Sequence, residues 1–296
     1  SGIDIDYAVL TSFSQDHLDY HKSIEEYGNA KSLLFKELKP RNSFIQIDSE
    51  FGKNLYENLL KDGAEVFSVS IKEESDFYAS FQKNNDSLEV NFKSPYGSFE
   101  FTLGTISRYI ASNVICSLAA LCVEGIELNE LAGCVSDIAL SQGRLEGIRI
   151  GKDICYVDYA HTPEALKHSL SEIREFHEGE IWCVFGCGGN RDKEKRPIMG
   201  EIAENYSDHV IITDDNPRFE NPSTIRSQIM KFCPKAIEIA DRSEAILTGV
   251  DQLKNGDALI IAGKGHENFQ IYGDSEYPFN DSEEASFAIQ ALGEKL

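Results

Sequence analysis

The sequence lacks several features that would each assign it to a broad class of protein. No apolar run is long enough to span a bilayer, and no signal-peptide pattern is present. Basic residues are few: 28 Lys and Arg stand against 50 Asp and Glu, which gives a formal net charge of -22. Such a charge opposes binding to nucleic acid or to an anionic membrane through the overall field. We therefore expect a protein that acts on small molecules.

The cysteines argue against a zinc site and against a disulfide framework. There are seven, most of them within apolar runs, and Cys183 and Cys187 lack the second Cys or His pair that would complete a zinc site. Free thiols in odd number, without a disulfide framework, are typical of a reducing compartment. We therefore expect a cytoplasmic protein.

The 296 residues, 41% hydrophobic and 26% charged, suffice for two globular domains. We place the joint near Gly147, after a polar stretch, and predict domains at 1–146 and 147–296. The first is predicted to combine helices with a mixed sheet, because buried strand patterns give way to alternating segments separated by turn residues. Its expected strands are Asp6–Leu10, Ser43–Asp48, Ala64–Ser70, Asp76–Gln82, Ser87–Lys93 and Ser98–Leu103. Its expected helices are Ile24–Leu38, Phe51–Lys61, Ile110–Val123 and Leu128–Ile138.

The second domain opens with a predicted hairpin turning on Gly151-Lys152-Asp153. From Pro163 onward helical and strand patterns alternate as far as Ala262, which predicts a parallel, doubly wound, Rossmann-like sheet. Ligands of such sheets gather at the carboxyl ends of the strands. The loops with unusual composition follow predicted strands, at residues 158–161, 186–191, 214–218 and 263–267.

The most informative stretch, residues 184–197, reads VFGCGGNRDKEKRP. A glycine turn after a strand lets backbone N–H groups approach an anion, and a helix start adds partial positive charge. An anionic ligand would need a local basic pocket, which Arg191, Lys193, Lys195 and Arg196 can supply. The alternative is an ordinary strand–turn–helix junction with a charged surface helix. A dinucleotide-binding dehydrogenase is disfavoured, because Arg191 stands where the third glycine of G-x-G-x-x-G should be.

Four segments carry a family resemblance. They are DHLDYH (16–21) with Ala30-Lys31, DYAHTP (158–163), FGCGGNRDKEKRP (185–197) with TDDNPR (213–218), and AGKGHE (262–267). Together, in this order, they resemble the Mur ligase family. The resemblance implies an α/β protein with the latter part of the ATP-binding central domain, followed by a Rossmann-like amino-acid-binding domain.

The resemblance also implies a reaction: ATP-dependent addition of meso-2,6-diaminopimelate to the D-Glu carboxylate of UDP-MurNAc-L-Ala-D-Glu, by a monomer. The carboxylate would become an acyl phosphate, which the incoming amine attacks. Mg²⁺ is the implied metal, with His17 as a ligand and Lys31, carboxylated by CO₂ to a carbamate, as another. The alternative for this pair is a loop histidine and a surface helix lysine.

On the nucleotide side, the resemblance assigns ATP contacts to Asn113, Arg144, Asp158 and His161. As alternatives, Asp158 can cap a helix and Arg144 can be a solvated linker residue. The family pattern has a second Asn where this chain has Ile110, and this departure weakens the assignment of Asn113.

On the amino-acid side, a diaminopimelate end is a zwitterion, which requires cations for its carboxylate and acceptors for its ammonium. The resemblance assigns the cations to Arg191 and Arg218, and the acceptors to Asp215, Asn216, the Gly263 carbonyl and Glu267, with Pro217 among the same contacts. A lysine substrate would leave Arg218 without a carboxylate, so this residue favours diaminopimelate. The alternative for 214–218 is a proline turn with an exposed arginine.

No G-x-x-G-K-[ST] phosphate loop occurs in the sequence, although the family has one early in its central domain. We therefore expect this chain to be a fragment that does not catalyse ligation alone. The competing hypotheses are a lysine-adding Mur ligase, a folylpolyglutamate synthetase-like ligase, and a non-catalytic anion-binding module.

Overall fold

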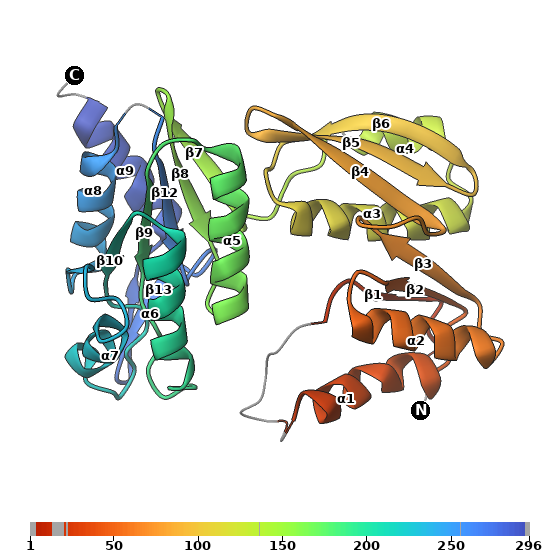
Figure 1. The fold of residues 1–296 in the computed structure, drawn as a ribbon, viewed down its shortest axis with the longest axis horizontal. Coiled ribbons are helices and arrows are strands. Elements are labelled where there is room, and N and C mark those ends of the chain that lie inside the picture. The colour runs from red at the N-terminus through yellow and green to blue at the C-terminus, as the bar shows by residue number, and fades with distance from the viewer. Residues whose placement is uncertain (1–3, 14–20, 22, 136, 255, 294–296) are drawn as a thin grey trace. The chain divides into compact units, whose positions relative to one another are not determined.

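The computed structural model describes residues 4–13, 21, 23–135, 137–254 and 256–293 (Figure 1). Contacts within the chain divide it into two compact units, Ser1–Ala139 and Leu140–Leu296. This division falls before the predicted joint near Gly147. The segment around Gly143 belongs to the second unit, because the Leu145 N–H donates to the Asp158 carboxylate (3.2 Å). In addition, a Cβ on Gly143 would lie only 2.2 Å from the backbone of Gly265.

The first unit contains a mixed sheet in the order β1-β2-β3-β4-β5-β6. Neighbouring strands are parallel from β1 to β4 and antiparallel from β4 to β6, so the predicted combination of buried strands and hairpins is confirmed. The strands are β1 (Tyr7–Leu10), β2 (Asn42–Gln46), β3 (Val66–Ser70), β4 (Phe77–Asn84), β5 (Ser87–Ser94) and β6 (Gly97–Leu103).

Two helices of this unit begin at side-chain caps that the sequence supplies. The hydroxyl groups of Ser23 and Ser49 accept hydrogen bonds from backbone N–H groups in the first turns of α1 and α2, which satisfies donors that a helix end leaves unpaired. α3 ends at Gly125, whose φ of 94° is accessible to glycine at little cost. The helices are α1 (Ile24–Lys36), α2 (Glu50–Lys61), α3 (Arg108–Glu124) and α4 (Leu128–Val135).

The second unit contains a sheet in the order β11-β10-β9-β12-β8-β7, parallel throughout except for the edge strand β7. This is the predicted doubly wound arrangement. Its strands are β7 (Glu146–Ile150), β8 (Asp153–Asp158), β9 (Ile181–Phe185), β10 (His209–Ile212), β11 (Ile237–Glu238) and β12 (Ala258–Ala262). Its helices are α5 (Pro163–Phe176), α6 (Lys195–Tyr206), α7 (Pro222–Met230), α8 (Arg242–Gln252) and α9 (Asp281–Gly293).

Helices cover both faces of this sheet, α8 and α9 on one side and α5 and α6 on the other (Figure 1). Successive side chains of a strand point to opposite faces, so the central strands are apolar throughout. Val184 and Leu259, for example, pack with Ala245 and Ile246 of α8 and with Ala285 of α9. Such a core fixes the strand ends, and with them the loops that follow.

The sequence analysis assigned no element after Ala262. The structure adds a hairpin there, β13 (Phe269–Tyr272) and β14 (Ser275–Pro278), followed by α9. Within the described ranges, no helix combines the length and the apolar character needed to cross a membrane.

Candidate functional site

The loops of unusual composition meet at one edge of the second sheet. Ala262 at the end of β12 pairs with both Asp158 and Phe185, and Phe185 pairs with Ile212. The strands β8, β9, β10 and β12 therefore end level with one another. This confirms that the loops after them lie together at the carboxyl edge, where ligands of such sheets bind.

The glycine turn after β9 packs against the loop after β10. The Gly189 N–H donates to the Asn216 carbonyl (2.9 Å). A Cβ would lie 1.9 Å from the Pro217 carbonyl oxygen at Gly189, and 2.3 Å from that of Thr213 at Gly186. At these two positions glycine is needed for close contact between two backbones. The following helix, α6, begins at Lys195.

Three of the predicted amino-acid-binding residues converge beside Gly188. A Cβ on this glycine would lie 2.9 Å from Arg218 Nη1, 3.7 Å from Asp215 Oδ1 and 3.8 Å from Arg191 Cγ. We call Arg191, Asp215 and Arg218 the arginine cluster. Two arginine side chains and one carboxylate thus meet beside this glycine, and guanidinium and carboxylate groups can bind the two charged groups of a zwitterion.

Arg218 is held in an unusual backbone conformation. Its φ is 53°, in the left-handed region that non-glycine residues seldom adopt. Strand β13 supports it, because the Arg218 N–H donates to the Ile271 carbonyl (3.0 Å) and the Gly273 N–H donates to the Arg218 carbonyl (2.8 Å). The side chain donates from Nη1 to the Gly189 carbonyl (3.0 Å). The hairpin that the sequence analysis missed thus fixes the direction of a predicted ligand-binding group.

A buried lysine connects two other predicted residues. Lys264 is fully buried, and its ammonium donates to Asn216 Oδ1 (3.1 Å), Glu267 Oε2 (3.0 Å) and the Phe269 carbonyl (2.6 Å). The sequence analysis attached no role to Lys264. The signal available was a lysine inside a Gly-Lys-Gly turn directly after a wholly apolar strand, since a lysine buried at such a place must find acceptors.

The other predicted residues of this region have backbone roles as well. Gly263 adopts a φ of 118°, and a Cβ there would lie 2.9 Å from Asp215 Oδ2. Its N–H donates to the Asp158 carbonyl (3.0 Å). The carbonyl of Pro217 accepts from the Glu220 N–H (3.1 Å). The turns at Gly263 and Pro217 therefore hold the loops of the carboxyl edge against one another.

The four cations of the predicted basic pocket differ in their contacts. Arg196 is fully buried, pairs with Glu220 (3.1 Å) and donates to the Gly188 carbonyl (3.1 Å). Lys195 donates to the His161 carbonyl (2.8 Å), and Lys193 pairs with Glu220 (3.2 Å). These cations hold the loops in place, and the Arg196 guanidinium lowers the pKa of the Glu220 carboxyl to about 2. Arg191 is exposed and makes no hydrogen bond or ion pair with the residues that the structure describes.

A second group of predicted residues surrounds Tyr159, in the loop after β8. The Arg144 guanidinium lies 4.5 Å from the centre of the Tyr159 ring, and the rings of His161 and His266 lie 4.6 and 5.1 Å from it. We call Arg144, Tyr159, His161 and His266 the tyrosine cluster. Its rings and its cation offer surfaces for stacking and for phosphate contact.

Asp158, the last residue of β8, directly precedes Tyr159 and is buried. It is 6% exposed, and its carboxylate accepts from the Leu145 N–H and the Ser169 hydroxyl. Burial raises the pKa of the Asp158 carboxyl, an effect that these two hydrogen bonds oppose. The cap of α5 is Thr162, so Asp158 is not the helix cap considered above. Its observed contacts fasten Leu145, beside Arg144, to the sheet.

Two of the predicted residues belong to the first unit. Lys31 is half-buried on α1, with its Nζ 5.0 Å from the centre of the Tyr27 ring. Asn113 lies on α3, and its buried Oδ1 has no hydrogen-bond partner among the described residues. His17 lies outside the described residues. Within those residues, no three His, Cys, Asp or Glu side chains gather as a metal site requires.

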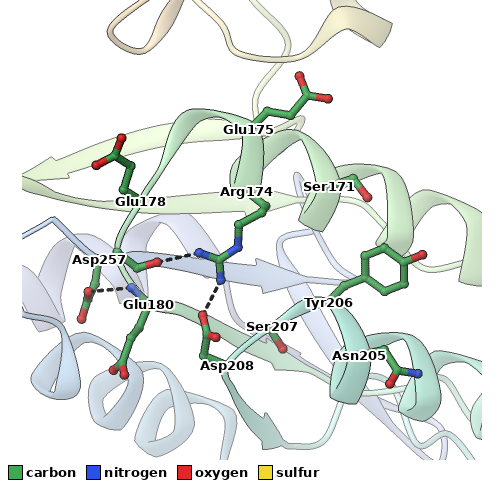
Figure 2. A pocket seen from close by; sticks show the side chains of 11 residues that line it. Ser171, Arg174, Glu175, Glu178, Glu180, Asn205, Tyr206, Ser207, Asp208 and Asp257 are labelled. Carbon is green, nitrogen blue, oxygen red and sulfur yellow. Dashed lines mark hydrogen bonds and ion pairs between the residues drawn. The ribbon is translucent and has the colours of Figure 1, made fainter.

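A groove at the opposite, amino edge of the second sheet contains none of the predicted residues. Its cavity volume is about 750 Å³, and Arg174 reaches Asp208 across it (Figure 2). The Asp208 and Asp257 carboxylates also accept hydrogen bonds from backbone N–H groups of β9 and its neighbourhood. Arg174, Asp208 and Asp257 therefore serve the fold.

Comparison with known proteins identifies the family of both units. Residues 1–121 match the family model "Mur ligase middle domain", and residues 143–265 match "Mur ligase, glutamate ligase domain". The chain belongs to the Mur ligase family. The matched C-terminal segment begins at Gly143 and ends at Gly265, so it contains both the arginine cluster and most of the tyrosine cluster.

Several relatives of this Mur ligase chain are named UDP-N-acetylmuramoyl-L-alanyl-D-glutamate–2,6-diaminopimelate ligase. The protein from Neisseria meningitidis serogroup A is 38% identical over 291 residues, covering 96% of this chain and 59% of the relative. That from Bacillus cereus is 38% identical over 298 residues, covering 97% and 60%. The chain thus spans about three-fifths of the length of these relatives.

Solved structures of the same family and of a folylpolyglutamate synthase resemble this chain in fold. A structure of a UDP-N-acetylmuramoyl-L-alanyl-D-glutamate–2,6-diaminopimelate ligase matches with a TM-score of 0.65 at 33% identity, over 99% of this chain and 61% of that one. A Mycobacterium tuberculosis folylpolyglutamate synthase matches with a TM-score of 0.73 at 17% identity, over 88% and 62%. At that identity the second likeness shows the fold alone.

Proposed function

We propose that this chain is part of an enzyme that uses ATP to join meso-2,6-diaminopimelate to the D-Glu carboxylate of UDP-MurNAc-L-Ala-D-Glu. The relatives named for this reaction are 34–39% identical to the chain over nearly its whole length, which supports the proposal. The observation that carries it is the arginine cluster. Arg191 and Arg218, distant in sequence, both lie within 4 Å of one point beside Gly188, with Asp215 between them in sequence and beside them in space.

The reaction has two chemical steps. A carboxylate oxygen of D-Glu attacks the γ-phosphorus of ATP, which releases ADP and gives an acyl phosphate. The free amine of diaminopimelate then attacks the acyl carbon, the tetrahedral intermediate expels inorganic phosphate, and the amine loses a proton. The enzyme must hold the amine against the acyl carbon and stabilise the negative charge that develops on oxygen.

We propose that the arginine cluster and its neighbours hold the end of diaminopimelate that does not react. The guanidinium groups of Arg191 and Arg218 would bind the distal carboxylate, as charge-assisted hydrogen bonds favour. Asp215, the Gly263 carbonyl and Glu267 would accept from the distal ammonium. Asn216 is 3% exposed, and its Oδ1 already accepts from Lys264 and from the Ile271 N–H, so it would act as a donor instead of the predicted acceptor.

The nucleotide side of the proposal uses the tyrosine cluster. Arg144 would meet ATP phosphates and His161 the nucleotide, with Asp158 holding the Arg144 segment in place. Asn113, on α3, stays a proposed ATP contact by resemblance, and its Oδ1 has no hydrogen-bond partner in the described part of the chain. For Mg²⁺, the proposal depends on the resemblance of His17 and Lys31, because the described residues alone form no metal site. A bound Mg²⁺ would neutralise phosphate charge.

We also propose that the enzyme works in the cytoplasm as a monomer. The buried free thiols of six cysteines suit a reducing compartment, and the net charge of -22 suits a soluble-substrate enzyme without a nucleic-acid partner.

A ligation assay of the complete protein tests this function. We expect ATP-dependent formation of UDP-MurNAc-tripeptide with meso-diaminopimelate, detected by mass spectrometry, and at least about a hundredfold lower kcat/KM with L-lysine, since Arg218 would be left unpaired. Removal of divalent cations with EDTA should stop the reaction, and Lys31→Ala should lower kcat strongly. Equal use of lysine would instead indicate a lysine-adding ligase. Nucleotide binding without product would indicate a non-catalytic module.

A further inference from the structure

The ammonium group of Lys264 has three protons and three acceptors. They are Asn216 Oδ1, Glu267 Oε2 and the Phe269 carbonyl, at 3.1, 3.0 and 2.6 Å. The side chain is fully buried, so no water competes for these protons. Such a fully satisfied group leaves nothing for a ligand, and its effect must pass through the side chains that it holds.

The first effect concerns the amide of Asn216. Its Oδ1 accepts from both Lys264 Nζ and the Ile271 N–H (3.0 Å), so the amide cannot turn over without losing two hydrogen bonds. Nδ2 then has to lie on the opposite side, where one of its two protons reaches Glu267 Oε2 (2.9 Å). The remaining proton of Nδ2 is a donor with a fixed direction.

The second effect concerns the carboxylate of Glu267. Oε2 accepts from both Lys264 and Asn216, whereas no hydrogen bond from the described residues reaches Oε1. The side chain is 26% exposed, so one oxygen is anchored inside and the other is available. Lys264 thereby gives Oε2 a structural role and leaves Oε1 for binding a ligand.

We propose that Lys264 is a positioning residue that sets the selectivity for a ligand ammonium at this site. By holding Asn216 and Glu267 together, it presents Glu267 Oε1 as an acceptor and Asn216 Nδ2 as a donor to the distal end of a zwitterionic amino acid. The inference depends on the proposed function, because that function supplies the ligand. It predicts that selectivity for the distal ammonium is lost when Lys264 is replaced, even where overall binding survives.

The test compares meso-diaminopimelate with 2-aminopimelate, which keeps the reacting end and the distal carboxylate but lacks the distal ammonium. In the complete protein, Lys264→Met should raise KM for meso-diaminopimelate about tenfold or more. KM for 2-aminopimelate should change less than about threefold, and kcat for both should change little, because binding at the distal end is equal in ground and transition states. The exposed Lys152, in the β7–β8 turn, provides a matched control: Lys152→Met should leave all these constants unchanged.

Removal of a buried lysine can prevent folding, so a second, nearly isosteric variant keeps the test decisive. In Glu267→Gln, Lys264 and Asn216 both require an acceptor, and the carboxamide must turn its oxygen toward them. Its NH₂ group would then face the ligand ammonium. We expect this variant to prefer 2-aminopimelate over meso-diaminopimelate, the reverse of the wild-type order.

Two results would overturn the inference alone. One is a proportional loss for both substrates in Lys264→Met with a lower melting temperature, which a merely structural lysine would give. The other is an unchanged preference for meso-diaminopimelate in Glu267→Gln. If the wild-type protein uses neither substrate, the proposed function itself fails, and the inference fails with it.

Discussion

The two edges of the second sheet differ in a way that identifies the site. The amino edge has a groove of about 750 Å³, but three of its charged groups are already engaged: Arg174 pairs with Asp208, and both Asp208 and Asp257 accept from backbone N–H groups. At the carboxyl edge, Arg191 makes no contact of this kind with the described residues, and Glu267 Oε1 has no donor among them. A charged ligand binds where hydrogen-bonding capacity remains, and this criterion selects the carboxyl edge over the groove at the amino edge.

The sign of the charge supports the same choice. The groove at the amino edge is lined by five carboxylates and one arginine, so it would repel phosphates and carboxylates; the acidic residues are Glu175, Glu178, Glu180, Asp208 and Asp257. The arginine cluster has two cations and one carboxylate. Within a protein of net charge -22, this is a local reversal of sign that an anionic group of a substrate can recognise.

The largest expected effect is that of Arg218→Ala. Without its guanidinium group, the distal carboxylate of diaminopimelate would be left without its partner, and we expect a loss of about 2–4 kcal/mol in kcat/KM for this substrate. The control is Arg174→Ala at the amino edge, which should leave kcat/KM unchanged and lower the free energy of unfolding by about 1 kcal/mol or less. Steady-state kinetics and urea denaturation measure both. A kinetic loss in Arg174→Ala, with none in Arg218→Ala, would mean that the substrate binds at the amino edge instead.

The sequence predicted most elements of both units because their apolar patterns are local. It also predicted that Arg191, Asp215 and Arg218 lie together, since parallel strands bring the loops after them to one edge. It did not predict that Arg196 and Lys195 serve the fold, because their partners Glu220 and the His161 carbonyl lie 24 and 34 residues away. The β13–β14 hairpin was missed although its signal is local: Gly273-Asp274 between two short strands is a two-residue hairpin turn. Its contacts with Arg218, by contrast, depend on packing against a distant loop.

Gly189→Ala is expected to destabilise the loops at the carboxyl edge without removing a proposed ligand-binding group. The new Cβ would lie 1.9 Å from the Pro217 carbonyl oxygen. To relieve this clash two backbone segments must move apart, which costs more free energy than the rotation of a side chain. We expect the free energy of unfolding to fall by about 2–3 kcal/mol. Gly133→Ala is the matched control, because a Cβ there meets nothing within 4 Å, and alanine in a helix should stabilise by about 0.5–1 kcal/mol. Equal stability of both variants would show that the two loops are not in close contact.

Gly188→Ala is expected to separate binding from stability. Its Cβ would meet only side chains, with Arg218 Nη1 nearest at 2.9 Å, and a guanidinium can move aside. We expect the free energy of unfolding to change by less than about 1 kcal/mol, whereas KM for meso-diaminopimelate should rise by about fivefold to tenfold as Arg218 is displaced. Thermal denaturation together with kinetics gives both values. A large loss of stability with unchanged KM would contradict the placement of Arg218 beside this glycine.

The last effect depends on pH and concerns Glu220, whose carboxylate pairs with Arg196 next to the glycine turn. The hydrogen bond from Arg196 lowers the pKa of the Glu220 carboxyl from 4.5 to about 2, so the folded state favours its charged form. The stabilisation is therefore fully present above about pH 4.5, and it is lost as the pH falls toward 2. Glu220→Gln should lower the free energy of unfolding by about 1–2 kcal/mol at pH 7, after allowance for screening by solvent, and the difference from wild type should shrink between pH 5 and pH 2. Urea denaturation across this range measures it. A difference that does not change with pH would mean that Glu220 acts through packing, and that the carboxyl edge retains its shape without this ion pair.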